Sequence, residues 1–282
     1  MGLEVSGEVV IPDDTHFKVG DRVGSLVIGG GYAEYCTAKA AHSVYISSEE
    51  EDEHTMARAA TFPETFFTVW SNLFWSDGPG RMRSGENILV HGGSGGIGTM
   101  AIRIGQVAGC PVIVTAGSDE KCNVCDNLGS FRSINYNRED FVNVVQDEIG
   151  GVDVILDVVG GSYISKHMNI LNRGGRHISI GFLQGSKVKD LNMLNLLAKG
   201  ITLTGSTLRR RPDDVKASIL EDALDYFTTF SKNKLTRNER TRHVFDILQP
   251  HVTEIFDLEN AAEAHVLMES RKHIGKIALR VS

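Results

Sequence analysis

The chain has 282 residues, a net charge of −7 at pH 7 and four widely spaced cysteines. This length is sufficient for a well-buried core divided between two lobes. The cysteine spacing gives no disulfide framework, no apolar h-region follows Met1, and no apolar run approaches the roughly 18 residues that span a bilayer. The negative charge gives no general attraction to nucleic acid or anionic lipid. We therefore expect a soluble, cytoplasmic protein that binds neither nucleic acid nor membranes.

The first 63 residues are predicted to form mainly β-structure. A strand is expected at 8–11, a turn at 20–23 and a hairpin at 29–35, and the acidic run at 47–53 is typical of the capped start of a helix over 56–60. Residues 1–6 formally match an N-myristoylation motif. Because Val5, Val9, Val10 and Ile11 indicate an interior strand, Gly2 is needed inside the fold, and we expect no lipid anchor.

A glycine-rich loop is the most informative segment. The sequence Gly93-Ser94-Gly95-Gly96-Ile97-Gly98 follows an apolar strand at 87–90 and opens a helix over 99–107. The glycines permit a sharp turn, close approach of backbone amides to a pyrophosphate, and tight packing of helix on strand. The phosphates would lie at the positive end of the helix. The loop predicts a dinucleotide site, with a purely structural glycine turn as the alternative.

The end of the next strand, at 112–116, indicates which dinucleotide binds. Sites for NAD carry an acidic residue there that binds the ribose 2′-hydroxyl, whereas this chain has Gly117 and Ser118. The Ser118 hydroxyl and the Lys121 charge can together hold a 2′-phosphate. The carboxylates of Asp119 and Glu120 count against a bound 2′-phosphate unless they face solvent. Ser118 can also cap the helix that begins near 119, and both roles are compatible. The pattern predicts NADPH.

Strands and helices alternate over residues 64–240. Further apolar strands are expected at 134–136, 154–159, 177–180 and 201–204. Between them, one helical face carries Phe141, Val145 and Ile149, and another follows Pro212 with Val215, Ile219 and Ala223. Apolar strands separated by helices predict an α/β fold with a doubly wound parallel sheet. Residues 241–282 return to strand, with a helix at 260–268 and a last strand at 276–281.

The sequence offers little evidence for a metal site. Cys122 and Cys125 form the only CxxC, inside a predicted helix and without a second pair. The spacing of His91, His167 and His177 suggests neither metal ligands nor a triad. We predict no metal site, and no residue is identified as catalytic.

Several motifs occur in the order found in one enzyme superfamily. They are Gly2-Leu3-Glu4-Val5-Ser6-Gly7, Gly20-Asp21-Arg22-Val23, Gly30-Gly31-Tyr32-Ala33-Glu34-Tyr35, the glycine loop, Asn135-Tyr136, Leu156-Asp157-Val158-Val159-Gly160-Gly161 and Ile274-Gly275-Lys276-Ile277. With them the chain resembles the medium-chain dehydrogenases/reductases, and among these the zinc-free, zeta-crystallin-like quinone oxidoreductases. Thr115-Ala116-Gly117-Ser118 and Gly160-Gly161-Ser162-Tyr163 place it nearest the tumour-suppressor-inducible branch. Leu3 stands where zinc-dependent relatives have histidine.

The resemblance implies three parts. A partial GroES-like, β-rich catalytic domain would cover 1–63, a Rossmann NADP-binding domain 64–240, and a return to the catalytic domain 241–282, with the cofactor in the cleft between lobes. The family's chain would begin well before Met1. Because the earlier residues supply half of the catalytic lobe, we expect little activity from this exact chain and more from an extended one.

The resemblance also implies the cofactor contacts. Gly93, Gly95, Gly96, Ile97 and Gly98 would meet the pyrophosphate, and Gly117, Ser118, Lys121 and Tyr136 the adenosine 2′-phosphate and ribose. The nicotinamide half would lie near Thr68, Gly181, Phe182, Thr207 and Leu208. Plain packing roles for Thr68, Tyr136 and Phe182 are the alternatives.

These features predict transfer of reducing equivalents from NADPH to small quinones or related conjugated carbonyls. The alternatives are an NADPH-dependent enone or enoyl reductase and a catalytically silent NADPH-binding structural protein. The strand at 201–204 would end the sheet with an apolar edge, and such an edge invites pairing with a second copy. We therefore expect a homodimer.

Overall fold

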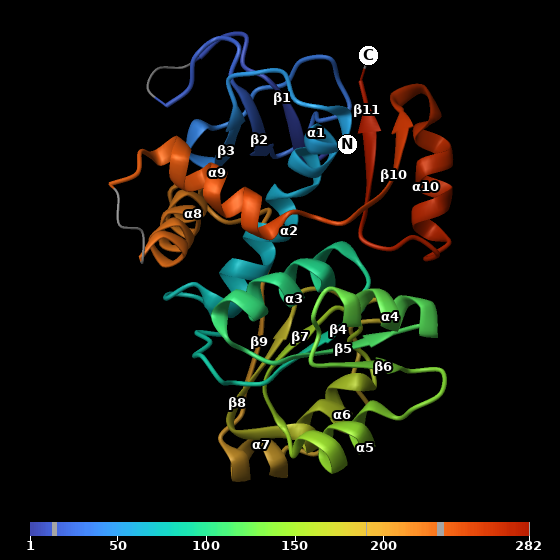
Figure 1. The fold of residues 1–282 in the computed structure, drawn as a ribbon. Coiled ribbons are helices and arrows are strands. Elements are labelled where there is room, and N and C mark those ends of the chain that lie inside the picture. Colours follow the sequence, from blue (N-terminus) through green and yellow to red (C-terminus); the bar gives the residue numbers. More distant parts are fainter. Residues whose placement is uncertain (13–15, 190, 230–233, 282) are drawn as a thin grey trace. The chain divides into compact units, whose positions relative to one another are not determined.

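The computed structural model describes residues 1–12, 16–189, 191–229 and 234–281. The chain forms two compact units, and we treat each by itself (Figure 1). The Rossmann unit is Val69–Thr207, and the split unit combines Met1–Thr68 with Leu208–Ser282. The second boundary therefore precedes the predicted residue 240. The helices Asp213–Thr228 and Arg237–Leu248, which follow it, pack on residues 40–47 of the split unit.

The Rossmann unit contains a six-stranded parallel sheet in the order β6-β5-β4-β7-β8-β9. Its strands are β4 (Ile88–His91), β5 (Val112–Ala116), β6 (Arg132–Asn135), β7 (Val152–Asp157), β8 (Leu171–Ser179) and β9 (Thr202–Gly205). All six predicted strands are confirmed, with shifted ends. β7 stops at Asp157 rather than 159, because the Asp157 carboxylate accepts the amides of Val159 and Gly160 and turns the chain.

Helices cover both faces of this sheet. They are η2 (Trp70–Phe74), α3 (Gly96–Ala108), α4 (Asp119–Asn127), α5 (Phe141–Val144), η3 (Val145–Ile149), α6 (Tyr163–Ile170) and α7 (Leu194–Lys199). Figure 1 shows α3 and α4 on one face and α5 and α6 on the other. Apolar residues of the sheet pack against α5 and α6 in a continuous core that includes Leu89, Ile155 and Met168. The doubly wound fold predicted from the sequence is confirmed.

The split unit contains two small sheets. β1 (Glu4–Glu8), β2 (Arg22–Leu26) and β3 (Ser43–Ser47) form an antiparallel sheet, and β10 (Val252–Asp257) pairs in parallel with β11 (Lys276–Arg280). Its helices are η1 (Ala40–His42), α1 (Glu53–Thr61), α2 (Pro63–Val69, which crosses the unit boundary), α8 (Asp213–Thr228), α9 (Arg237–Leu248), η4 (Leu258–Asn260) and α10 (Ala261–Glu269). The aromatic rings of Phe62, Phe66, Phe67 and Phe245 pack together in its core.

Two predicted elements of the split unit differ from the structure. β1 ends at Glu8, so the strand predicted at 8–11 is wrong, and Val10 and Ile11 are 51% and 88% exposed. The last register pair of β1 is Glu8 with Arg22, and beyond it the backbone of Val9 bonds to Asp21 and Gly20. The predicted hairpin at 29–35 has no strand; its glycines instead bond back to the amino end, with the Gly30 amide donating to the Met1 carbonyl.

The helix caps also differ from expectation. α1 is capped by Asp52, whose side chain accepts the Thr55 amide, and not by a serine of the acidic run. α9 is an additional helix, begun by a capping box between Thr236 and Glu239. In the described part of the chain, no helix has the length and apolar character needed to cross a membrane.

Candidate functional site

The glycine loop joins β4 to α3 at the carboxyl end of the sheet, where the strand order reverses between β4 and β7. This switch point is where open α/β sheets bind ligands. The amides of Gly92 and Gly93 both donate to the Thr115 carbonyl, at 3.1 and 2.9 Å, and hold the loop against β5. A Cβ on Gly93 would lie 2.3 Å from the Cβ of Val114, so only glycine fits there.

Gly98 and Gly95 of the same loop have different neighbours. A Cβ on Gly98 would lie 2.4 Å from the Cα of Gly93, so this glycine permits the close packing of helix on strand. A Cβ on Gly95 would meet only the Gly92 carbonyl, at 3.4 Å, so the space above this residue is open. Gly95 is also the N-cap of α3 and offers no side-chain cap to the first amides of the helix. An uncapped helix amino end beside open space is a suitable cradle for a diphosphate.

At the end of β5, Ser118 caps α4 by accepting the Lys121 amide at 3.2 Å, which confirms the capping role. The two acidic residues that follow are exposed. Asp119 is also engaged, because its carboxylate accepts bonds from Asn135, at 2.6 Å, and from Arg138. Neither carboxylate therefore takes the place of the acid that binds the ribose of NAD.

Tyr136 follows β6 and extends over the same corner. A Cβ on Gly117 would lie 2.6 Å from the Tyr136 hydroxyl, and the Asn137 amide donates to the Gly117 carbonyl at 2.7 Å. Tyr136 packs against Gly117 and is half exposed. The structure adds Asn137 and Arg138 to this corner. Their position directly after a parallel strand was the signal that could have identified them.

The ends of β7 and β8 meet in a second loop pair. The amides of Leu183 and Gln184 donate to the carbonyls of Val158 and Val159, at 3.0 and 2.8 Å. Phe182 lies against Gly160, where a Cβ would approach its ring to 2.6 Å. Phe182 is 50% exposed, so a simple core role does not describe it.

The remaining predicted cofactor residues are divided between the units. Gly181 and the exposed Thr207 follow β8 and β9 in the Rossmann unit. Thr68 and Leu208 are buried in the split unit. The Rossmann unit thus brings together at one edge of its sheet the predicted residues from Gly93 to Thr207.

Four polar side chains are buried under the carboxyl end of the sheet. His91, Asp157, His167 and His177 all have 2% exposure or less. The Nε2 atoms of His91 and His167 lie 2.7 Å apart, and His177 Nε2 lies 3.2 Å from an Asp157 carboxylate oxygen. The spacing of these residues along the sequence gave no sign of this cluster.

The burial of these groups determines their charge. Desolvation lowers the pKa of His91 to about 4 and holds the pKa of His167 well below its usual value. Desolvation alone would raise the pKa of Asp157, but hydrogen bonds from His177 and the Val159 amide outweigh it, so the pKa is lowered. The cluster therefore presents neutral His91 and His167 beside a carboxylate at neutral pH.

The cysteines offer no comparable chemistry. All four are free thiols, and three are buried. Desolvation raises the pKa of Cys110 to about 11 and that of Cys125 to about 12, so neither is a thiolate at neutral pH.

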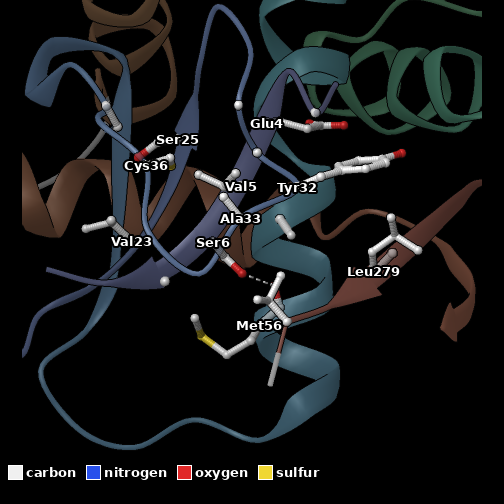
Figure 2. A pocket seen from close by; sticks show the side chains of 18 of the residues that line it. Glu4, Val5, Ser6, Val23, Ser25, Tyr32, Ala33, Cys36, Met56 and Leu279 are labelled. Carbon is white, nitrogen blue, oxygen red and sulfur yellow. Dashed lines mark hydrogen bonds between the residues drawn. The ribbon is translucent and has the colours of Figure 1, made fainter. Parts of the chain in front are cut away.

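The split unit has a large apolar hollow of about 2060 Å³ (Figure 2). Val5 and Val23 from the antiparallel sheet, Met56 from α1 and Leu279 from β11 line it, and Ser6 donates to the Met56 carbonyl at 2.7 Å. Small-molecule pockets usually measure about 300–1,000 Å³. The hollow is therefore too large to be shaped around one small ligand.

A cluster of charged side chains is among the polar groups that line this hollow. Lys276 Nζ lies 2.6 Å from a Glu4 oxygen, and the other Glu4 oxygen accepts the Glu64 amide at 2.8 Å. Burial, followed by the Glu4 charge, raises the pKa of Glu64. Gly2 also lies at this edge, where a Cβ on it would lie 2.6 Å from the Cα of Gly31, so Gly2 packs closely against Gly31.

Comparison with known proteins agrees with this architecture. Residues 96–224 match the family described as zinc-binding dehydrogenase. The quinone oxidoreductase of Sus scrofa is 29% identical over 99% of this chain and 78% of its own length, and that of Homo sapiens is 32% identical over 73% of this chain and 61% of its own. The structure of Escherichia coli quinone oxidoreductase complexed with NADPH superposes with a TM-score of 0.75 at 23% identity, covering 99% of this chain and 81% of that one.

The fold is that of the medium-chain dehydrogenases/reductases. Homologues of the chain are quinone oxidoreductases of this superfamily, at about 30% identity. The segment that matches this family does not include Leu3. The words 'zinc-binding' in the family's description therefore say nothing about Leu3, which stands where zinc-dependent relatives have histidine.

Proposed function

We propose that the protein is an NADPH-dependent quinone oxidoreductase of the zinc-independent, zeta-crystallin-like type, nearest the tumour-suppressor-inducible branch. The observation that carries the proposal is homology to quinone oxidoreductases along nearly the whole chain, combined with a glycine loop that fits a diphosphate. Small quinones and related conjugated carbonyls are the proposed substrates. A cytoplasmic location belongs to the same proposal and is supported by the four free cysteines.

The residues of the Rossmann unit fit NADPH. The first amides of α3 would hold the diphosphate over Gly95, where the structure leaves open space. Ser118, Lys121 and Tyr136 would hold the 2′-phosphate, because the neighbouring acid Asp119 is already bound to Asn135 and Arg138. Once bound, NADPH supplies the hydride equivalent for reduction.

The chain's own part in the reaction is placement and exclusion of water. Half-exposed Phe182, held against Gly160, provides an apolar face at the carboxyl end of the sheet, and Gly181 and Thr207 lie on the strand ends beside it. Such a face can cover a planar ring and keep water away from it. The roles of Thr68 and Leu208 at the nicotinamide stay predictions.

Cofactor choice tests the first half of the proposal. We expect NADPH to bind at least about ten times more tightly than NADH, a difference of about 1.4 kcal/mol that one charge-assisted contact can supply. Lys121→Ala should weaken NADPH selectively in a fluorescence titration. Lys272→Ala, on an exposed residue of the split unit, is the matched control. Equal weakening of both cofactors by Lys121→Ala would assign Lys121 to folding instead.

Substrate choice tests the second half. The full chain is assayed for NADPH oxidation with a small para-quinone, a small ortho-quinone and a conjugated enone. Faster turnover of the quinones supports the proposal. Faster turnover of the enone would favour an enone reductase, and tight NADPH binding without turnover of any substrate would favour a silent binding protein.

We also propose a homodimer. β9 is the edge of the six-stranded sheet, and Leu203 on it is 40% exposed. Leu194 and Leu197 on neighbouring α7 are exposed as well. An uncovered apolar edge is suited to pairing with a second copy. Sedimentation at micromolar concentration should give a dimer that Leu203→Lys converts to monomer, and a monomeric unaltered protein would overturn this part.

A further inference from the structure

The buried histidine cluster lies on the α5 and α6 face of the Rossmann sheet, outside the proposed nucleotide contacts. His91 ends β4, Asp157 ends β7 and His167 lies on α6. One ligand atom from each of these three residues lies within 4.8 Å of the other two. Phe141 and Tyr163 pack against the His91 ring at 5.0 and 5.1 Å between centroids, so the groups are enclosed by aromatic side chains.

Hydrogen bonds leave this cluster incomplete. His91 is satisfied, because its Nδ1 lies 2.9 Å from the Thr115 hydroxyl and its Nε2 lies 2.7 Å from His167. Nδ1 of His167 and Nδ1 of His177 are buried without any partner. No choice of tautomer removes these two unpartnered nitrogens. Buried polar side-chain atoms are in the large majority hydrogen-bonded, so two unpartnered nitrogens mark this cluster as an unusual polar site in the core.

We propose that His91, Asp157 and His167 bind a divalent transition-metal ion of the zinc class inside the Rossmann unit. Two imidazoles and one carboxylate are a donor set used for Zn²⁺, with a fourth position left for water or another ligand. The site goes beyond the proposed hydride transfer, because it lies on the other side of the sheet plane from the helix that receives the diphosphate.

The His91–His167 pair needs only a small adjustment to hold an ion. Zn–N distances of about 2.0–2.1 Å in a tetrahedral site place two ligand nitrogens about 3.3 Å apart. The 2.7 Å separation of His91 and His167 would therefore widen by about 0.6 Å. Rotation of His167 on α6 can provide this opening, since its Nδ1 has no hydrogen bond to break.

Supporting contacts for such a site are already present. The Thr115 hydroxyl lies within hydrogen-bond distance of the far ring nitrogen of His91. His177 and the amides of Val159 and Gly160 hold the Asp157 carboxylate. Partners of this kind orient metal ligands and strengthen binding by about 10–100-fold. His177 is therefore a positioning residue.

Metal titration of the full chain tests the proposal. After treatment with chelator, the protein is titrated with Co²⁺, whose visible absorption reports the ligand geometry, and then with Zn²⁺ in competition. Metal content is measured per chain. We expect one ion per chain, and at least about 100-fold weaker binding in His167→Gln and Asp157→Asn, which exceeds the effect of an outer partner. His177→Gln should weaken binding by about 10–100-fold.

Two controls separate this site from surface binding and misfolding. His243→Gln removes an exposed histidine of α9 and should leave the metal affinity unchanged. Circular dichroism identifies any variant that has failed to fold, and the site is then judged on Asp157→Asn, which keeps the side-chain volume. No stoichiometric ion in the unaltered protein, or equal binding by the folded ligand variants, would overturn the proposal. Because metal binding is measured without substrate, its failure is distinct from a failure of the proposed reductase function.

Discussion

The two units of this protein reach very different degrees of closure. In the Rossmann unit, strand residues such as Leu89, Ile113 and Ile155 are completely buried, and helices cover both faces of the sheet. In the split unit, three antiparallel strands and a separate parallel pair surround a hollow of about 2060 Å³, and Ile11 is almost fully exposed. The Rossmann sheet is covered on both faces, whereas the sheets of the split unit leave a large hollow beside them.

The comparison shows that a unit can have a well-packed core without closed sheets around it. The split unit still has a dense aromatic core around Phe62 and Phe245, made from segments almost 200 residues apart in the chain. Its order therefore comes from a small packed centre and not from a closed sheet. The Rossmann unit instead depends on glycines that let helix and strand approach closely.

The largest expected effect comes from the aromatic centre of the split unit. Phe245→Ala should reduce the free energy of unfolding by about 3–5 kcal/mol, the usual cost of removing a buried phenylalanine. Phe245 is completely buried and contacts the Phe62 ring at 5.6 Å between centroids. Urea denaturation measures the change. Ile11→Ala, at an exposed position, should change it by less than about 0.5 kcal/mol. Similar effects from both variants would mean that the split unit has no packed centre.

The next effect separates packing from binding inside one loop. Gly93→Ala should destabilise the protein by about 1–3 kcal/mol, because the added carbon overlaps Val114. Gly95→Ala should change stability by less than about 0.5 kcal/mol, since it meets only open space. It should nevertheless weaken NADPH at least about tenfold by occupying the diphosphate position. If folded Gly95→Ala binds NADPH with full affinity, the proposed position of the diphosphate at this loop is wrong.

A smaller effect depends on pH. Burial alone would raise the pKa of Glu86, but the hydrogen bond from Arg176 outweighs it, and the pKa is lowered below its ordinary 4.5. The pair therefore contributes stability above about pH 4.5, and this contribution is lost as the pH falls through the lowered folded value.

Glu86→Gln should accordingly cost about 1–2 kcal/mol at pH 7. The difference in free energy of unfolding between Glu86→Gln and the unaltered protein should disappear as the pH falls below about 4.5. Urea denaturation of both proteins between pH 7 and acid pH measures this difference. A difference that stays constant with pH would show that Glu86 contributes through its shape and not through its charge.

The sequence predicted those features that depend on local pattern. The glycine loop, the Ser118 cap and the alternation of strands and helices each occupy a short stretch, where residue type and spacing restrict the backbone strongly. The prediction of a strand at 8–11 was wrong for a physical reason. Apolar residues indicate a tendency to be buried, but they do not indicate whether a partner strand continues beside them. Val10 has no such partner after Glu8 pairs with Arg22.

The histidine cluster was beyond sequence reasoning for another reason. His91 and His167 are 76 residues apart, and Asp157 and His177 are 20 apart. They meet only because the sheet order puts β7 between β4 and β8. A spacing rule that looks for ligands along one helix or loop cannot detect a site made by strand order.

Thr115 connects two parts of the Rossmann unit. Its carbonyl accepts the amides of Gly92 and Gly93 in the nucleotide loop, and its hydroxyl contacts His91 in the buried cluster. Any displacement of this residue is therefore felt in both places. Thermodynamic linkage makes such an effect reciprocal: to the extent that occupancy of the loop shifts Thr115 and changes the affinity of the cluster, occupancy of the cluster changes the affinity of the loop by the same factor.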